Sequence, residues 1–190
     1  MNVKDTKTEI LDLAEDLLLD KGFNAFSYAH ISSALKIKNA AIHYHFPTKG
    51  ELGAAVILRA RDRFSKWTRD ERMLSKSPDE KLEAFFRSYL RFLDAGQRVC
   101  LGGALETDFK TLPSNMQGET RKFVSAIVLW VGQVLKEGKE TGVFSFPGKA
   151  GDQALVILST LQGALQMTRA VGPSCLHSAM DQVRRLTGKR

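Results

Sequence analysis

Apolar residues recur every three or four positions along most of the chain, and no stretch shows the alternation of apolar and polar residues that is typical of β-strands. The first such series has its apolar positions at Ile10, Leu13, Ala14, Leu17 and Leu18. Thr6 and Glu9 are spaced as a capping box, and Gly22 suits the C-terminal end of a helix. The pattern predicts an all-α protein whose first helix is capped by Thr6.

Residues 27–49 have the pattern of two short helices joined by a tight turn. Ser27 suits the N-cap of the first helix, because its hydroxyl can accept a hydrogen bond from a free backbone N–H. The apolar positions on one face of this helix are Ile31, Ala34 and Leu35. A second helix is predicted from about Asn39 to Phe46. On it, Ile42 and Phe46 lie four residues apart, on the side expected to pack against the rest of the domain.

Helices are predicted for most of the remaining chain as well. Their expected ranges are about 48–72, 78–95, 100–109, 114–141, 152–171 and 174–186, with a loop at 74–77. Thr48 and Glu51 are spaced as a capping box at the start of the first of these helices. Ser77, Pro78 and Glu80 mark the start of the second, because an N-cap is followed there by Pro and Glu at favoured positions.

The predicted helices divide the chain into an N-terminal helix-turn-helix domain of three helices, residues 1–50, and a larger C-terminal helical bundle, residues 51–190. A chain of 190 residues is compatible with one large domain or with a small domain fused to a larger one. The boundary falls inside the long helix that begins near residue 48. We therefore expect a mechanical connection between the two domains rather than a flexible linker.

Acidic residues are distributed unevenly along the sequence. No Asp or Glu occurs between Asp20 and Glu51, although the chain contains 21 of them. The same interval holds Lys21, Lys36, Lys38, Lys49 and three of the four histidines. A surface that meets DNA must lack carboxylates, since each would repel the phosphate backbone. With the formal net charge of +7, the interval indicates an anionic partner, and a merely solvated basic face is the alternative.

The run His43–Phe46, followed by Lys49 and Leu52, resembles the end of the recognition helix in the tetracycline-repressor (TetR) family of bacterial regulators. The resemblance covers residues 6–52, about a quarter of the chain. It implies a DNA-binding domain followed by a helical body that binds an effector and dimerises through its last helices.

Two positions depart from the family pattern. The family usually has Gly in the turn where this chain has Lys36, and a residue other than Gly at positive φ costs about 1 kcal/mol. We therefore expect the turn to differ slightly here. The first aromatic residue of the family's run is replaced by His43, so we expect a difference in the base that is contacted or in the strength of the contact.

The resemblance also implies which residues contact DNA. Tyr44, His45 and Lys49 would bind phosphates, with help from Ser27 or Tyr28. Lys49 lies in the first turn of a helix, where N–H groups and the helix dipole favour a phosphate. The expected base contacts come from Lys38, Asn39, Ala40 and His43. The full predicted DNA-binding set is Ser27, Tyr28, Lys38, Asn39, Ala40, Ala41, His43, Tyr44, His45 and Lys49.

Aromatic residues are numerous in the predicted helical body. Some of them could line an effector cavity, since small-molecule sites are mostly apolar. The candidate effector-binding residues are Phe64, Trp67, Phe85, Cys100, Phe109, Phe123 and Trp130. The alternative is that each of them is an ordinary core residue.

Cys100 is the candidate with reactive chemistry. It follows Arg98, and if it opens a helix, the cation and the helix dipole would both lower the pKa of its thiol. A thiolate there could react with electrophiles or oxidants, and the segment that begins at Cys100 is similar to that of a TetR branch in which some members sense reactive compounds. A buried, unreactive thiol is the alternative. Nearby, Glu106 and Asp108 could bind a cationic ligand or be solvated.

The last two predicted helices, about 152–186, carry apolar stripes that could pair with a second copy in a four-helix bundle or complete the core of the monomer. The resemblance favours a homodimer. The predicted function is a DNA-binding transcriptional regulator, a repressor released from a near-palindromic double-stranded operator by a small-molecule or reactive-species effector. The alternative is a helical-bundle protein, an apolar-ligand carrier or an enzyme, that does not bind DNA.

Other classes of protein find little support in the sequence. It contains no Gly-rich phosphate loop, nucleophile elbow or zinc motif, so we expect neither enzyme activity nor a cofactor. His43 and His45 lie two residues apart and so do not share a helix face, which argues against a metal site. The first residues are polar, the apolar run at 123–135 is too short to span a bilayer, and there are only two cysteines. We therefore expect a cytoplasmic protein that is not bound to a membrane.

Overall fold

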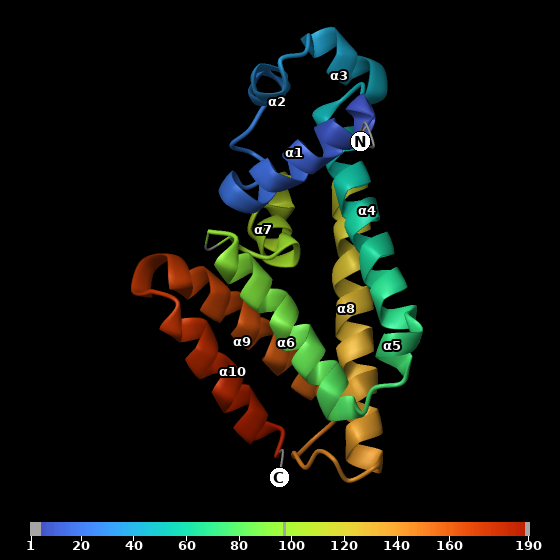
Figure 1. The fold of residues 1–190 in the computed structure, drawn as a ribbon, viewed down its shortest axis with the longest axis vertical. Helices are drawn as coiled ribbons and strands as arrows, with labels where there is room; N and C mark the ends of the chain where they lie inside the picture. The colour runs from blue at the N-terminus through green and yellow to red at the C-terminus, as the bar shows by residue number, and fades with distance from the viewer. Residues whose placement is uncertain (1–4, 97, 189–190) are drawn as a thin grey trace. The chain divides into compact units, whose positions relative to one another are not determined.

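The computed structural model describes residues 5–96 and 98–188 of the chain, and within them all regular structure is helical (Figure 1). The α-helices are α1 Thr6–Lys21, α2 Tyr28–Leu35, α3 Asn39–His45, α4 Lys49–Arg69, α5 Glu71–Leu74, α6 Pro78–Asp94, α7 Leu101–Thr107, α8 Ser114–Glu140, α9 Ala150–Val171 and α10 Ser174–Leu186. A short 3-10 helix, η1, covers Phe109–Thr111. The predicted all-α class is confirmed. In the part of the chain that the structure describes, no helix combines the length and apolar character that a membrane span requires.

The described chain forms two compact units. The first consists of the described residues up to Arg63 together with Leu101–Phe123, and the second consists of Phe64–Cys100 and the described residues from Val124 onward. Helices α4 and α8 each contribute residues to both units. The predicted division at residue 50, between a DNA-binding domain and a larger helical domain, is a division by function, and it stays a prediction.

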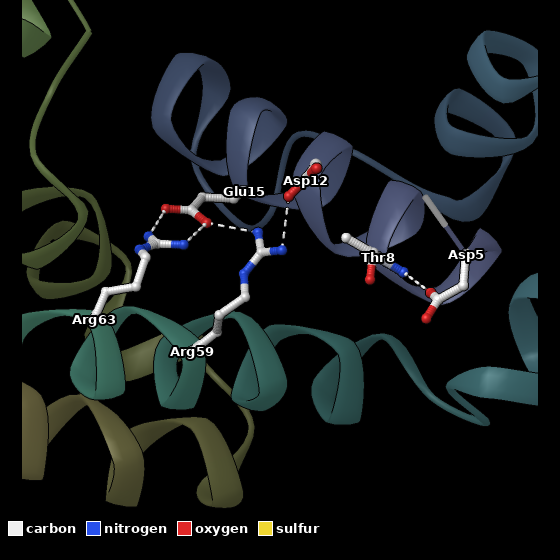
Figure 2. A network of polar contacts seen from close by, with 6 residues as sticks. All are labelled: Asp5, Thr8, Asp12, Glu15, Arg59 and Arg63. Carbon is white, nitrogen blue, oxygen red and sulfur yellow. Dashed lines mark hydrogen bonds and ion pairs between the residues drawn. The ribbon is translucent and has the colours of Figure 1, made fainter. Parts of the chain in front are cut away.

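The start of α1 differs from the prediction. Asp5, not Thr6, is the N-cap, and its Oδ1 accepts a hydrogen bond of 2.7 Å from the backbone N–H of Thr8 (Figure 2). This bond from the backbone is the main reason that the pKa of Asp5 lies below its usual value. The capping box predicted at Thr6 and Glu9 is wrong, because an Asp one residue earlier is an equally favoured N-cap and makes Thr6 the first helical residue.

The capping box predicted at Thr48 and Glu51 and the helix start predicted at Ser77 are confirmed. The N–H of Thr48 donates to Glu51 Oε2 over 2.9 Å, and the N–H of Glu51 donates to Thr48 Oγ1 over 3.2 Å. At the start of α6, Ser77 and Glu80 form the same reciprocal arrangement, with Pro78 in the first turn. These local signals therefore define where α4 and α6 begin.

The predicted helix over 48–72 and the loop at 74–77 need correction. Helix α4 ends at Arg69, and α5 covers Glu71–Leu74. The break occurs at Asp70, whose backbone is extended and whose side chain accepts a hydrogen bond from the N–H of Arg72 over 2.9 Å. Asp70 thus acts as the N-cap of a new helix at a position where the apolar pattern alone predicted continuation.

The second unit has a core built largely by α9 and α10, which form a helical hairpin (Figure 1). The buried apolar residues of these two helices are Ala154, Ile157, Leu158, Leu161, Ala164, Leu165, Leu176, Met180 and Val183. Leu155, which the helical spacing would place on the same stripe as Leu158, is instead 52 % exposed. Leu155 lies on the side of α9 opposite the core, together with other apolar residues.

The helix-turn-helix is held in the first unit by a few buried side chains. Ile31, Ile42 and Phe46 are buried, as predicted for the inner faces of α2 and α3. Ala34 is exposed and Leu35 is only half-buried, so the buried face predicted for α2 is too wide. Among the eight residues of α2, Ile31 is the one whose side chain is buried in the core.

Lys36 forms the turn between α2 and α3. It adopts the left-handed conformation, with φ 55° and ψ 39°, and in the part of the chain that the structure describes it is the one residue other than Gly with positive φ. Its N–H and that of Ile37 both donate to the carbonyl of Ser32. The turn therefore does not avoid the left-handed conformation, and Lys36 carries the strain that Gly would avoid.

We expect Lys36→Gly to raise the free energy of unfolding by at most about 1 kcal/mol, because it removes the Cβ that disfavours this conformation. The matched control is Lys66→Gly, at an exposed position inside α4, where Gly adds entropy to the unfolded chain and should lower stability. Urea denaturation followed by circular dichroism measures both. Equal losses of stability in the two variants would contradict strain at Lys36.

Candidate nucleic-acid interface

Helix α3 separates its anchors from its exposed side chains. Ile42 and Phe46 are buried, whereas Tyr44 is 83 % exposed. The other exposed residues of the predicted DNA-binding set are Ser27, Lys38, Asn39, Ala40 and His43, while Tyr28, Ala41, His45 and Lys49 are partly buried. The structure thus brings the predicted base contacts together on the turn before α3 and along one exposed side of α3.

Tyr28 supports α3 from within the unit. Its hydroxyl donates a hydrogen bond of 2.7 Å to the carbonyl of Phe46, and its ring lies edge-on to His43 at 4.8 Å. Burial, aided by the negative charge of Glu51, raises the pKa of Tyr28 to about 12. The hydroxyl therefore stays protonated, and its hydrogen is used at the end of α3 instead of being free for a phosphate.

Two histidines of the helix-turn-helix have defined hydrogen bonds. His30 Nδ1 lies 2.9 Å from the backbone nitrogen of Ser27, whose N–H donates to it, so His30 takes the place that Glu usually has in a capping box. No sequence pattern predicts this role for His30, because His is not a usual capping partner. His43 Nδ1 lies 3.1 Å from the carbonyl oxygen of Pro47.

Lys49 points into the first unit. Its Nζ donates to the carbonyl of Phe23 over 2.5 Å and lies 4.3 Å and 4.5 Å from the ring centroids of Phe23 and Phe26. Burial lowers the pKa of Lys49, and the carboxylate of Asp108 partly opposes this effect. In this conformation the ammonium holds the loop between α1 and α2, and it would have to leave the Phe23 carbonyl to reach a phosphate.

Asp108, far from this loop in the sequence, also anchors it. Its Oδ2 accepts hydrogen bonds from the N–H groups of Phe23, at 2.8 Å, and Asn24, at 3.4 Å. Gly22, with φ 81°, fits beneath this carboxylate, because a Cβ there would lie 3.0 Å from Oδ2. Asn24 also donates to Thr111 Oγ1 over 2.7 Å. Asp108 therefore has a structural role that sequence reasoning missed, since its partners lie about 85 residues away.

A network of ion pairs fixes α1 against α4 (Figure 2). Arg59 donates through Nη1 to Asp12 Oδ1 and through Nη2 to Glu15 Oε2, both at 2.7 Å. Arg63 forms a bidentate pair with the same Glu15. The Nε of Arg59 is buried without a hydrogen-bond partner in the described structure, so its guanidinium depends on the two carboxylates. This network sets the position of α1, which supports the helix-turn-helix.

Four of the predicted effector residues form one aromatic cluster in the second unit. Trp130 lies 5.9 Å from Phe64, 5.1 Å from Trp67 and 5.9 Å from Phe85. Cys100 is buried in the core of the same unit, directly before α7. Phe109 and Phe123 belong to the first unit instead, and the guanidinium of Arg121 lies over the ring of Phe109. Sequence reasoning did not separate these two groups.

Comparisons with known proteins agree with the geometry of helices α1 to α3, which together are called the head below. Residues 10–56 match the family described as "Bacterial regulatory proteins, tetR family". The chain is 33 % identical to a TetR transcriptional regulator from Legionella pneumophila, covering 97 % of this chain and 98 % of that one, with a TM-score of 0.84. A TetR family regulator from Agrobacterium tumefaciens is 28 % identical, with 95 % and 97 % covered and a TM-score of 0.88. The transcriptional repressor NemR of Escherichia coli is 22 % identical over 191 residues, 96 % of this chain and 94 % of NemR.

We expect Glu15→Ala to lower the free energy of unfolding by about 1–3 kcal/mol, because it removes the acceptor of Arg63 and one of the two acceptors of the partly buried Arg59. The control is Lys122→Ala, which removes an exposed pair with Glu119 and should cost less than about 1 kcal/mol. Urea denaturation measures both. Equal effects in the two variants would contradict a special role for the α1–α4 network.

Proposed function

Because the chain belongs to the TetR family of DNA-binding transcriptional regulators, we propose that α3 enters the major groove of an operator and that the protein represses transcription until an effector releases it. The observation that carries the proposal is the exposed side of α3 and of the turn before it, which is free of carboxylates and rich in hydrogen-bonding groups. Membership in this family of regulators sets aside the alternative of an enzyme.

The DNA contacts divide into phosphate and base contacts. Tyr44 is the best-supported phosphate contact, since its side chain is 83 % exposed. His45 follows it directly, with its ring 5.1 Å from that of Tyr44, and Ser27 is exposed at the start of α2. The base contacts come from Lys38, Asn39 and His43, with Ala40 and Ala41 allowing close approach. For Tyr28 and Lys49 we propose an indirect role, because their polar groups hold the carbonyls of Phe46 and Phe23.

Homodimerisation through α9 and α10, residues 152–186, is the second part of the proposal. The side of α9 away from the core carries exposed apolar residues: Leu155, Val156, Met167 and Val171. Gly163 lies between them with open space around it, so a second helix could approach closely there. Several large apolar side chains exposed on one helix are typical of a protein interface. Two heads in one dimer would bind a near-palindromic operator whose half-sites lie about 34–36 Å apart or a multiple of that distance.

The effector site is proposed at the aromatic cluster around Trp130 in the second unit. Its apolar character favours an apolar or aromatic small molecule. The other proposed class of effector is a reactive species, which would react with the thiol of Cys100 in the core of the same unit. Either would favour a conformation that does not fit the operator, which is a population shift between two states. The helices α4 and α7 lead from residues of the second unit to the anchors of the head, Arg59, Arg63 and Asp108.

Substitutions in the head separate direct from indirect DNA contacts. Tyr44→Ala should weaken binding to all sequences about tenfold without lowering the melting temperature, because it removes an exposed contact. Lys49→Met should weaken binding and also lower the melting temperature, because it frees the Phe23 carbonyl. It should leave the slope of log affinity against log salt concentration unchanged. A slope that falls by about 0.9 with an unchanged melting temperature would instead indicate a direct phosphate contact by Lys49.

The dimer interface is tested by introducing charge on the exposed side of α9. Met167→Glu, at a residue 54 % exposed, should convert the dimer to a monomer in analytical ultracentrifugation and weaken operator binding, because a charge would be buried in the interface. The matched control is Leu129→Glu on α8, at a residue 65 % exposed, which should leave the dimer intact. A dimer that survives Met167→Glu, or that Leu129→Glu disrupts, would contradict the proposed interface.

A further inference from the structure

The hydrogen bond between His43 and Pro47 determines which nitrogen of His43 carries a hydrogen. A carbonyl oxygen can only accept, so His43 Nδ1, 3.1 Å from Pro47 O, must be the donor. In the neutral imidazole the other nitrogen, Nε2, then has a lone pair and no hydrogen. In this neutral form the exposed ring of His43 presents a hydrogen-bond acceptor at Nε2.

An acceptor on this helix is selective for its partner. Phosphate oxygens are acceptors too and cannot bind a neutral Nε2. In the major groove the donors are the exocyclic amino groups, N6 of adenine and N4 of cytosine, whereas guanine and thymine present only acceptors there. We propose that His43 recognises adenine or cytosine in each half-site by accepting a hydrogen bond from the exocyclic amine at Nε2. This inference rests on the proposed binding of α3 in the major groove.

The ring of His43 is held before DNA arrives. Its backbone is fixed by the burial of Ile42 beside it. Its ring lies against Tyr28, which is tied to the carbonyl of Phe46, while Nδ1 is tied to the carbonyl of Pro47. A contact from a side chain held in this way loses little entropy on binding, so it can discriminate between bases.

His45 offers the comparison within the same helix. Its ring lies 5.1 Å from that of Tyr44, and neither of its ring nitrogens bonds a carbonyl in the part of the chain that the structure describes. Its tautomer is therefore not fixed by the protein, and it can donate to a phosphate. His43 is therefore suited to a base amine and His45 to a phosphate, although they lie only two residues apart.

The test begins with selection of bound sequences from random double-stranded DNA by the full-length protein and by His43→Phe. Phe keeps an aromatic ring against Tyr28 and removes both nitrogens, and circular dichroism confirms that the variant is folded. We expect one symmetry-related pair of positions to lose its base preference in His43→Phe, with the other positions unchanged. His45→Phe is the control and should keep the preference at that pair.

The second step removes the amine itself from the selected operator. At the position that depends on His43, adenine is replaced by purine or cytosine by 2-pyrimidinone, each of which lacks only the exocyclic amine. Wild type and His45→Phe should lose about five- to tenfold in affinity, the range of one neutral hydrogen bond. His43→Phe should lose nothing further, because the two changes remove the same bond.

Several results would overturn the inference. One is a selected site whose preferences are the same for wild type and His43→Phe. Another is a uniform loss of affinity over all sequences in His43→Phe with a smaller salt slope, which would make His43 a phosphate contact. A third is dependence on guanine N7, revealed by 7-deazaguanine, which would require Nε2 to donate. A wild-type protein that enriches no sequence would overturn the proposed function, and this inference with it.

Discussion

The helices that carry most of the proposed DNA-binding residues, α2 with eight residues and α3 with seven, are too short to be stable in isolation. Their existence depends on the burial of Ile31, Ile42 and Phe46 and on the hydrogen bond from Tyr28 to the Phe46 carbonyl. With these anchors in place, the opposite side of α3 can carry hydrogen-bonding and small side chains. The exposed interface is thus a consequence of a small apolar contact set beneath it.

The same head is tied to the rest of its unit by charged groups. Arg59 and Arg63 of α4 bind carboxylates of α1, and Asp108, just after α7, holds the N–H groups at the end of α1. Each of these anchors lies on or beside a helix whose chain leads to residues of the second unit. A regulator that responds to a ligand in its body needs such connections, because the ligand can act on DNA binding only through a change in the head.

The sequence allowed the fold class, most helix ranges and the position of the recognition helix to be predicted, because these follow from local periodicity and capping. The error at Asp5 arose because two adjacent residues could each act as a cap, and the error at Asp70 arose because the apolar pattern continues across the break between α4 and α5. The inward positions of Tyr28 and Lys49 and the anchor at Asp108 could not be predicted. Each depends on a contact between residues 18 to 85 positions apart, and no local pattern encodes such a contact.

Selection of bound fragments from the host genome by the full-length protein tests whether a dimer recognises a two-fold symmetric operator through α3. We predict enrichment of a near-palindromic site whose half-site centres lie about 34–36 Å apart or a multiple of that distance. The affinity for this site should fall steeply as the salt concentration rises. No enrichment, or an enriched site without two-fold symmetry, would contradict a dimeric repressor that recognises its operator through α3.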